Sequence, residues 1–365
     1  MPIPPASERI HLYDSVHHDG LIMKIVVLAG GLSPERDVSL SSGVMAANAL
    51  IDRGHQVILA DLFMGLDAIP DDPALLFLTA GRPTPYSVSL HAPDLAAVRS
   101  SRVSGLSSTI GNGIVELCKT ADITYLALHG GDGENGRLQA FLDLNDIKYT
   151  GSPSFGCAVA MDKWVTKQLL LAAGVKTPNG FLLHKGDSIP FHKFPCVVKP
   201  CCGGSSLGIT IPQNETEFQA SLKEAFLLED AVLVEEYISG RELTCGILGE
   251  RPLPPTEIIP HDGFYDYAHK YQPGWTDEIT PARIPCDITE EIQRLTKIVY
   301  HTLHLEVYAR VDFLLTEAGE LYCLEANTLP GMTPTSLLPQ GAAEIGIDYP
   351  SLCEQIINLS LRKYI

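Results

Sequence analysis

The chain has 365 residues, of which 45% are hydrophobic and 19% charged, a composition typical of a folded protein with two or three domains. Its formal net charge of -18 argues against a dominant interaction with nucleic acids or anionic membranes, which a basic surface usually supports, so neither is expected as a partner. No apolar run approaches the ~20 residues that cross a bilayer.

The cysteines and the N-terminal segment indicate the cellular context. The nine cysteines include no Cys-x-x-Cys pair and mostly lie within apolar stretches, which predicts reduced thiols in a cytoplasmic protein. Residues 1–22 show neither an apolar period nor the continuous apolar region of a secretory signal. They are predicted to be a disordered leader or extension.

Alternating strand and helix patterns fill the first part of the chain. The first apolar run ends at Gly30 and Gly31, which is the glycine turn of a strand-turn-helix opening. Strands and helices are predicted at residues 25–29, 39–50, 57–61, 123–128 and 137–144. This alternation predicts a doubly wound parallel α/β domain over residues 23–152, with a long excursion at 70–113.

The pattern changes after a helix predicted at residues 161–174. Short β-rich runs at 196–199 and 231–234 predict a small α+β domain over residues 153–234. The last domain, residues 235–365, is predicted to contain strands and helices at residues 242–248, 289–303, 309–315, 321–325 and 349–361.

A strand end followed by a glycine- and serine-rich loop is the first candidate for chemistry. Lys199 ends the strand, and the loop at 201–208 can turn several backbone N–H groups toward one anion. This design suits a phosphate, and it is not the Walker pattern, because the lysine precedes the loop. A β-hairpin with a flexible tip explains this segment equally well. Cys201 and Cys202 could suggest a metal, but adjacent cysteines without a second pair are poor zinc geometry.

Two neighbouring strands near the C-terminus carry a second polar cluster. Alternation places Arg310 and Asp312 on one face of the first strand, and Glu325 and Asn327 on one face of the next. Two carboxylates and an amide are ligands that Mg²⁺ accepts when nucleotide phosphates fill the remaining positions. A solvated sheet face is the alternative, but the otherwise apolar strands favour a metal site.

Six separated motifs, taken together, resemble those of the D-alanine:D-alanine ligases, which belong to the ATP-grasp class. The resemblance extends from about Lys24 to the C-terminus, and it implies an ATP-grasp fold behind an N-terminal doubly wound parallel sheet. In order, the motifs are GGLSPERDVS at 30–39, LHG at 128–130, AMDK at 160–163, KPCCGGSSLG at 199–208, FYDYAHKY at 264–271 and LEANTLPGMT at 324–333.

The resemblance implies a reaction and its participants. ATP phosphorylates the carboxylate of one D-alanine, and the amine of a second attacks the acyl phosphate. The products are D-alanyl-D-alanine, ADP and phosphate, and the dipeptide serves peptidoglycan precursor synthesis. Two Mg²⁺ or Mn²⁺ ions and a homodimeric assembly are also implied.

The same resemblance assigns the nucleotide and metal residues. Lys163, Lys199 and Lys270 would contact phosphates, Glu235 would lie on the adenine side, and Glu242 would bind the ribose. The metal ligands would be Asp312, Glu325 and Asn327.

For the amino-acid substrates, the resemblance assigns Glu35 to the ammonium of the first alanine, with Ser205 and Tyr271 as its partners. Arg310 and the N–H of Gly331 would stabilise the tetrahedral oxyanion. The second carboxylate would meet Ser336 and Leu337. His129 lies at a strand end over the same cleft, where a binding role and a structural role are equally open. Residues 262–274 would form a lid.

The sequence departs from the family pattern at the glycine-rich loop. Cys201, Cys202 and Gly203 stand where many members have a serine, a basic residue and an acid, so no catalytic role is assigned to these side chains. Glu236 stands where some members have lysine, but the family uses that position mainly through its backbone.

Several competing functions are weighed against this one. A ligase that adds D-lactate or D-serine shares the class, although Tyr271 favours an amine over D-lactate, because D-lactate ligases often have histidine there. A peptide ligase or a biotin-dependent carboxylase component is another ATP-grasp alternative. A dinucleotide-binding dehydrogenase is disfavoured because GxGxxG is missing after the first strand. A non-catalytic nucleotide-binding regulator would not need the lysines, metal ligands and substrate acid together.

Overall fold

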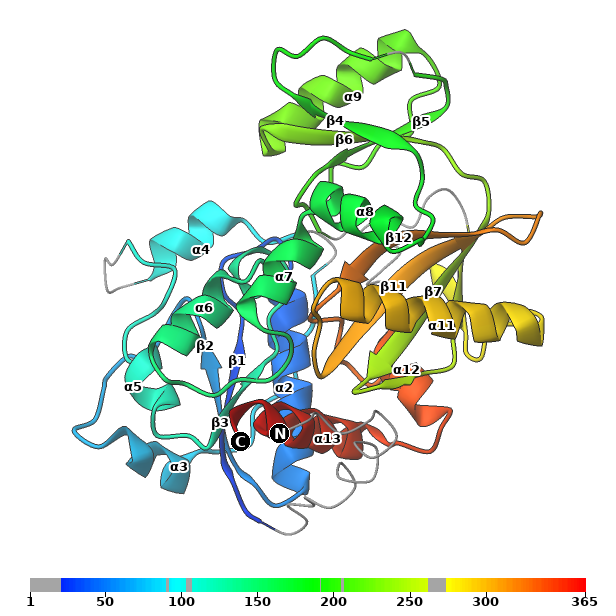
Figure 1. The fold of residues 1–365 in the computed structure, drawn as a ribbon. Helices are drawn as coiled ribbons and strands as arrows, with labels where there is room; N and C mark the ends of the chain where they lie inside the picture. Colours follow the sequence, from blue (N-terminus) through cyan, green and yellow to red (C-terminus); the bar gives the residue numbers. More distant parts are fainter. Residues whose placement is uncertain (1–20, 90–91, 103–106, 191, 205–206, 262–273) are drawn as a thin grey trace, which may run out of the picture.

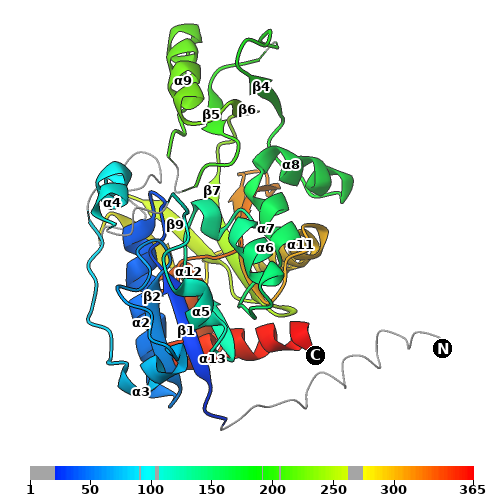
Figure 2. The ribbon, with the colours of Figure 1, turned by 90° about the vertical axis from the view of Figure 1, so that its left-hand side faces the viewer.

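The computed structural model describes residues 21–89, 92–102, 107–190, 192–204, 207–261 and 274–365. Figures 1 and 2 show these residues from two sides, with three separate sheets around which the helices are arranged. Predictions for the leader up to residue 20, for Ser205, and for Lys270 and Tyr271 in the proposed lid fall outside the described residues.

The first unit is a parallel sheet whose strand order is β2-β1-β3. Residues 25–29 of β1 are fully buried, which matches the apolar run of the sequence. Helix α2 packs on β1 and β2, as the strand-turn-helix pattern predicts. The bounds are β1 (Lys24–Ala29), α2 (Arg36–Asp52), β2 (Gln56–Asp61), α5 (Ile114–Cys118), β3 (Ile123–Leu126) and α6 (Arg137–Leu144). The prediction of a parallel α/β domain is confirmed.

The excursion between β2 and α5 contains short helices in its described part. They are η1 (Pro73–Leu75), α3 (Leu76–Thr79) and α4 (Leu95–Ser101). Asp94 starts α4 by accepting hydrogen bonds from the backbone N–H groups of Ala96 and Ala97. The weak periodicity of this segment is therefore explained by helices too short to show a full apolar stripe.

A small antiparallel sheet with strand order β4-β6-β5 forms a separate layer, at the top of Figure 1. Helix α9 packs on it through Phe218, which is fully buried against apolar side chains of the strands. The bounds are β4 (Gly180–His184), β5 (Cys196–Pro200), α9 (Glu215–Leu228) and β6 (Ala231–Glu236). The sheet places the end of β5, and hence the glycine-rich loop, beside the rest of the molecule.

The largest sheet has the strand order β10-β9-β7-β11-β12, with β8 paired to β7. All of these pairings are antiparallel, and α11 covers the buried apolar side chains of the sheet. The bounds are β7 (Arg241–Leu248), β8 (Arg251–Pro252), β9 (Thr256–Pro260), β10 (Thr276–Ile279), α11 (Cys286–Thr302), β11 (Tyr308–Leu315) and β12 (Leu321–Asn327).

The helix predicted at residues 161–174 is present as α8 (Lys163–Ala172), and a further helix, α7 (Ser154–Met161), precedes it. The chain turns between the two helices at Asp162, whose backbone is extended at φ -82° and ψ 101°. The Asp162 carboxylate then caps α8 by accepting from the N–H of Val165 at 2.9 Å. Both helices pack in the core of the large sheet, so the predicted domain 153–234 combines segments with different packing partners.

The C-terminal segment returns to the first unit. Helix α12 (Leu337–Ala343) packs on β7, and α13 (Tyr349–Leu361) packs on α2, ahead of the short turn η3 (Arg362–Tyr364). Side chains of α13 belong to the same apolar core as β1, although the predicted boundaries assign them to residues 235–365. Among the described helices, none is both long and apolar enough to cross a bilayer.

Candidate active site

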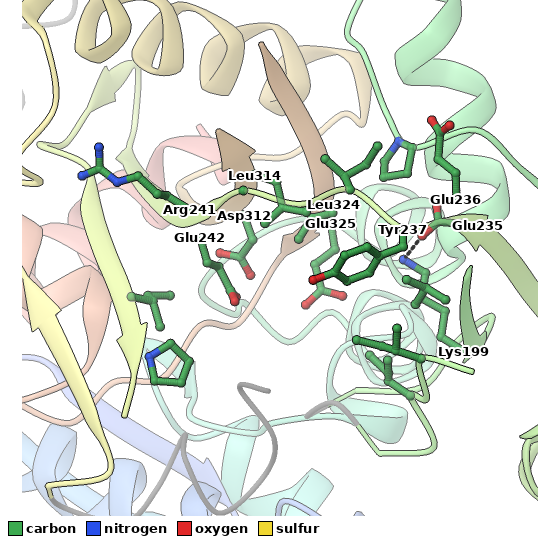
Figure 3. Close-up of a pocket in the computed structure, with 18 of the residues that line it drawn as sticks. Lys199, Glu235, Glu236, Tyr237, Arg241, Glu242, Asp312, Leu314, Leu324 and Glu325 are labelled. Carbon is green, nitrogen blue, oxygen red and sulfur yellow. Dashed lines mark ion pairs between the residues drawn. The ribbon is translucent and has the colours of Figure 1, made fainter. Parts of the chain in front are cut away.

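A cavity of about 670 Å³ lies between the small and the large sheet, within the size range of small-molecule sites. Figure 3 shows the carboxylates of Glu242, Asp312 and Glu325 directed into it, with Lys199 and Glu235 at one end. These residues come from β7, β11, β12, β5 and β6 respectively. Five strands from two sheets therefore bring together residues that the sequence analysis assigns to nucleotide binding and metal binding.

A buried network of one acid and two lysines forms the floor at the end nearest the small sheet. Glu235 is only 4% exposed, and its two carboxylate oxygens lie 2.6 Å from Lys167 Nζ and 2.6 Å from Lys199 Nζ. Burial alone would raise the pKa of Glu235, but the two ammonium charges outweigh it and hold the pKa below its usual value. The acid stays ionised and fixes Lys199 at the cavity wall.

Lys167 is the residue of this network that the sequence analysis missed. It also donates to Thr177 Oγ1 at 3.0 Å and to the carbonyl of Pro178. Burial lowers its pKa, and the charge of Glu235 opposes this only in part. The sequence could have indicated Lys167, because it lies four residues after Lys163 in a predicted helix and therefore on the same helix face.

Lys163 connects the glycine-rich loop to the predicted metal ligands. Its Nζ donates to the carbonyl of Gly203 at 2.5 Å and lies 3.4 Å from Glu325 Oε2, while its backbone N–H donates to the carbonyl of Cys201 at 3.0 Å. Burial would lower the pKa of Lys163, but the charge of Glu325 outweighs it and the pKa is raised. The lysine is thus a permanent cation at the edge of the cavity.

The three predicted metal ligands meet in the register of β11 and β12. Asp312 pairs with Glu325 and Arg310 with Asn327 across the strands. Asp312 accepts two hydrogen bonds from Arg310 at 3.0 Å, one from Asn327 Nδ2 at 3.0 Å and one from Thr244 Oγ1 at 2.5 Å. The donor set consists of carboxylate and amide oxygens, which is the chemistry that hard Mg²⁺ or Mn²⁺ ions accept.

Glu35 lies outside this cavity, where the first unit meets the glycine-rich loop. A Cβ at Gly130 would stand 2.3 Å from Glu35 Oε2, and a Cβ at Gly204 would stand 3.0 Å from the same oxygen. Gly130 also has a φ of +65°, which side chains rarely adopt. Gly130 therefore requires glycine, whereas a side chain at Gly204 would need only a slight shift of the Glu35 carboxylate. The contact with Gly204 places this carboxylate beside the residue that precedes Ser205, its predicted partner in the sequence.

His129 bridges the first unit and the loop after β12. Its Nδ1 lies 2.9 Å from the carbonyl oxygen of Leu329, and its Nε2 lies 2.9 Å from Ser42 Oγ. Since a carbonyl only accepts, Nδ1 carries the hydrogen and Nε2 accepts from the serine in the neutral ring. Burial lowers the pKa of His129, which favours this neutral form. Both ring nitrogens thus have protein partners.

Glu134 makes the same connection through its carboxylate, and the sequence analysis did not select it. Its oxygens accept from the backbone N–H of Gly130 at 2.7 Å and of Leu329 at 3.1 Å. Burial, followed by the charge of Glu35, raises the pKa of Glu134 to about 8. The sequence could have indicated Glu134 by its position in the turn after β3, because ligand-binding sites often lie at the carboxyl ends of parallel strands.

The loop beyond Leu329 holds the remaining predicted substrate residues. Ser336 Oγ lies 2.8 Å from Thr333 Oγ1 and accepts from the N–H of Thr333 at 3.1 Å, and a Cβ at Gly331 would stand 2.9 Å from it. Leu337 begins α12. This loop does not line the 670 Å³ cavity, whereas Arg310 lines it. The predicted residues therefore form two neighbouring groups.

Comparison with known proteins decides the family. Family models described as the N-terminus and the C-terminus of D-ala D-ala ligase match residues 24–152 and 185–358. The chain belongs to the D-alanine–D-alanine ligase family. Two members are the D-alanine–D-alanine ligases of Pediococcus pentosaceus, 43% identical over 92% of this chain and 97% of the relative, and of Lacticaseibacillus casei, 41% identical over 94% and 97%.

Solved ligase structures share the fold. A D-alanine–D-alanine ligase from Bacillus anthracis complexed with ATP has a TM-score of 0.71 and 29% identity, and covers 93% of this chain and 98% of its own. The ligase from Coxiella burnetii has a TM-score of 0.73 and 26% identity, with coverages of 94% and 95%. The predictions of an ATP-grasp fold and of an ATP-dependent D-alanine–D-alanine ligase are confirmed, and the dehydrogenase and regulator alternatives are not favoured.

Proposed function

We propose that this ligase uses the 670 Å³ cavity for ATP and the neighbouring group around Glu35 for the two D-alanines. The observation that carries this division is the glycine-rich loop, because it reaches both places. Lys163 bonds to Gly203 on one side, and Gly204 approaches Glu35 on the other. A phosphoryl group held by this loop would be delivered directly to a carboxylate bound beside Glu35.

At the nucleotide end, we assign Lys163 and Lys199 to the phosphates, because both are cations with ion-pair partners that hold them at the wall. Glu235 is assigned to hold Lys199 in place beside the adenine subsite, since lysines occupy both of its oxygens. Glu242 faces the same cavity and is assigned to the ribose. Lys270 retains its predicted phosphate role.

Asp312, Glu325 and Asn327 would hold the two Mg²⁺ or Mn²⁺ ions, which neutralise negative charge on the transferring phosphoryl group. Arg310 now bonds to Asp312 through two nitrogens, which keeps the acid oriented toward the cavity. The same guanidinium would share its charge with the oxyanion that forms when the second amine attacks. It thus links the metal ligands with the reacting carbon.

At the amino-acid end, Glu35 would receive the ammonium of the first D-alanine, with Ser205 and Tyr271 as its predicted partners. The N–H of Gly331 would face the oxyanion, and Ser336 and Leu337 would receive the second carboxylate. Positioning of this loop is assigned to His129 and Glu134. Both bond to the backbone of Leu329, two residues before Gly331.

D-Alanine is proposed as the second substrate over D-serine and D-lactate, and the lid at 262–274 is proposed to select it through Tyr271. We also propose a cytoplasmic homodimer. All nine cysteines lie within the described residues as free thiols, which supports a reducing compartment.

The decisive experiment incubates the full chain with ATP, Mg²⁺ and D-alanine, measures phosphate release and identifies the product by mass and chirality. Parallel reactions replace D-alanine in part by D-serine or D-lactate, and a control omits the amino acid. D-Alanyl-D-alanine with stoichiometric ADP and phosphate is expected. A mixed product made in preference to it would overturn the proposed second substrate.

A further inference from the structure

Three potential metal ligands outside the nucleotide cavity come together where α8 begins. The Sγ atoms of Cys201 and Cys202 and a carboxylate oxygen of Asp162 all lie within 4.8 Å of one another. The cysteines follow β5, whereas Asp162 separates α7 from α8. No further metal ligand stands next to the two cysteines in the sequence. In the folded protein Asp162, which is 39 residues from Cys201, lies beside them.

Hydrogen bonds fix these two segments against each other. Cys201 Sγ donates to Asp162 Oδ1 at 3.3 Å, and the N–H of Lys163 donates to the carbonyl of Cys201 at 3.0 Å. The N–H of Cys202 donates to Glu229 Oε2 at 2.8 Å. Cys201 is buried and Cys202 is exposed, so the group is held by the fold and still open to solvent.

The surroundings favour a thiolate at Cys202 and a protonated thiol at Cys201. Helix α8 has 10 residues, and its first turn meets Cys201 through the backbone N–H of Trp164, so the positive end of the helix faces the sulfur. The hydrogen bond between the two thiols lowers the pKa of Cys202 and raises that of Cys201. The charge of Lys163 acts in the same direction on Cys202, while Glu229 and Asp162 oppose it.

We propose that Asp162, Cys201 and Cys202 bind a thiophilic divalent cation of the Zn²⁺ or Cd²⁺ class. Two thiols would each release a proton to solvent and form a metal–sulfur bond, the carboxylate would add an oxygen ligand, and water would complete a tetrahedron. Tetrahedral bonds of about 2.3 Å place two sulfurs roughly 3.8 Å apart, so only a small movement of the ligand atoms is needed.

This site differs from the proposed Mg²⁺ site in chemistry as well as in place. Its two sulfurs select soft cations, whereas Asp312, Glu325 and Asn327 offer only hard oxygen ligands. A cation bound here would fix the start of the loop that continues to Gly203 and Gly204. The expected consequence is reversible inhibition of ligation, and this consequence, unlike the binding itself, rests on the proposed function.

Binding is tested by titrating the reduced full chain with Cd²⁺ in the absence of nucleotide and following the ultraviolet charge-transfer band of cadmium thiolates. Two thiolates per tightly bound Cd²⁺ are expected. Cys202→Ser should weaken binding at least about tenfold, and Asp162→Asn, which keeps a capping side chain, should weaken it less. Cys286→Ser removes the other exposed cysteine and is the matched control, expected to bind as wild type.

Inhibition is tested separately by measuring phosphate release with saturating Mg²⁺ as Zn²⁺ is added, each variant being compared with its own zinc-free rate. Wild type and Cys286→Ser should be inhibited and recover with a chelator, and Cys202→Ser should resist. A thiolate band that persists unchanged in folded Cys202→Ser would overturn the site. Normal binding without inhibition would refute only the effect on ligation, and an inactive wild type with a normal band would refute the proposed function alone.

Discussion

The two ends of the proposed active site are built in different ways. At the nucleotide end, charged side chains on strands and on α8 hold one another, as Glu235 does with Lys167 and Lys199. At the amino-acid end, Glu35 and the loop around Leu329 are positioned mainly through backbone groups and close glycine contacts. Side-chain networks on rigid elements suit the constant part of the reaction, ATP, whereas loop contacts can be adjusted to the amino acid.

The comparison can be tested at the metal ligands, where the largest effect is expected. Glu325→Ala removes a carboxylate proposed to neutralise phosphoryl charge, a loss of several kcal/mol in transition-state stabilisation, and turnover should fall about a thousandfold. Phosphate release at varied Mg²⁺ measures this. Glu320→Ala, which removes an exposed acid in the turn just before the same strand β12, should retain normal turnover. Wild-type-like rates in Glu325→Ala would remove the metal assignment.

A second test probes the buried network itself. Glu235→Gln leaves two lysines without their counter-charge in a buried place, and the free energy of unfolding should fall by about 3–5 kcal/mol. Urea unfolding measures this loss. Glu236→Gln is the matched control, because its neighbouring carboxylate is exposed and an amide can still accept from Asn179. Equal stability of both variants would show that the lysines do not depend on Glu235.

The third test concerns the amino-acid end. Glu35→Gln removes the charge proposed to pair with the substrate ammonium, and the KM for D-alanine should rise roughly ten- to a hundredfold, since hydrogen bonds to charged groups contribute about 1.5–3 kcal/mol. The KM for ATP serves as the internal control and should change little. Equal changes in both constants would contradict the division of the site into two ends.

The last test concerns how stability depends on pH at the amino-acid end. The pKa of Glu134 is raised from 4.5 to about 8, so the folded protein keeps a proton that the unfolded chain loses near pH 4.5. The stability contributed by this group is therefore present below pH 4.5 and is lost as pH rises through 8. Glu134→Gln, which carries no charge, should flatten this decline in urea unfolding between pH 5 and 8.5. A slope identical to that of wild type would contradict the raised pKa.

Sequence analysis predicts a residue's role when the residues that it contacts lie close to it in the chain. The parallel sheet, the strand end at Lys199 and the pairing of Asp312 with Glu325 follow from periods and alternation within short segments. The role of Glu134 does not, because its partner Leu329 is 195 residues away and is contacted through its backbone. The third ligand beside Cys201, Asp162, escapes sequence analysis for the same reason.

Helix α7, which the sequence analysis did not predict, and the assignment of α13 show the same limit. Residues 154–161 form too short a helix to show an apolar period, and Val159 and Ala160 are recognised as core residues only once they pack on the large sheet. Similarly, the apolar period of α13 predicts a helix but not the sheet against which it packs. Only the fold shows that its apolar face completes the first unit.

The packing of α13 on α2 also orders events during protein synthesis. The apolar core around β1 includes side chains from the 13 residues of α13, which emerge from the ribosome more than 300 residues after β1. The usual order of events, in which the N-terminal domain folds first, therefore leaves this core incomplete until α13 has been synthesised. The two sheets around the 670 Å³ cavity, whose strands end at Asn327, have their residues available before α13, so the unit around β1 completes its packing after them.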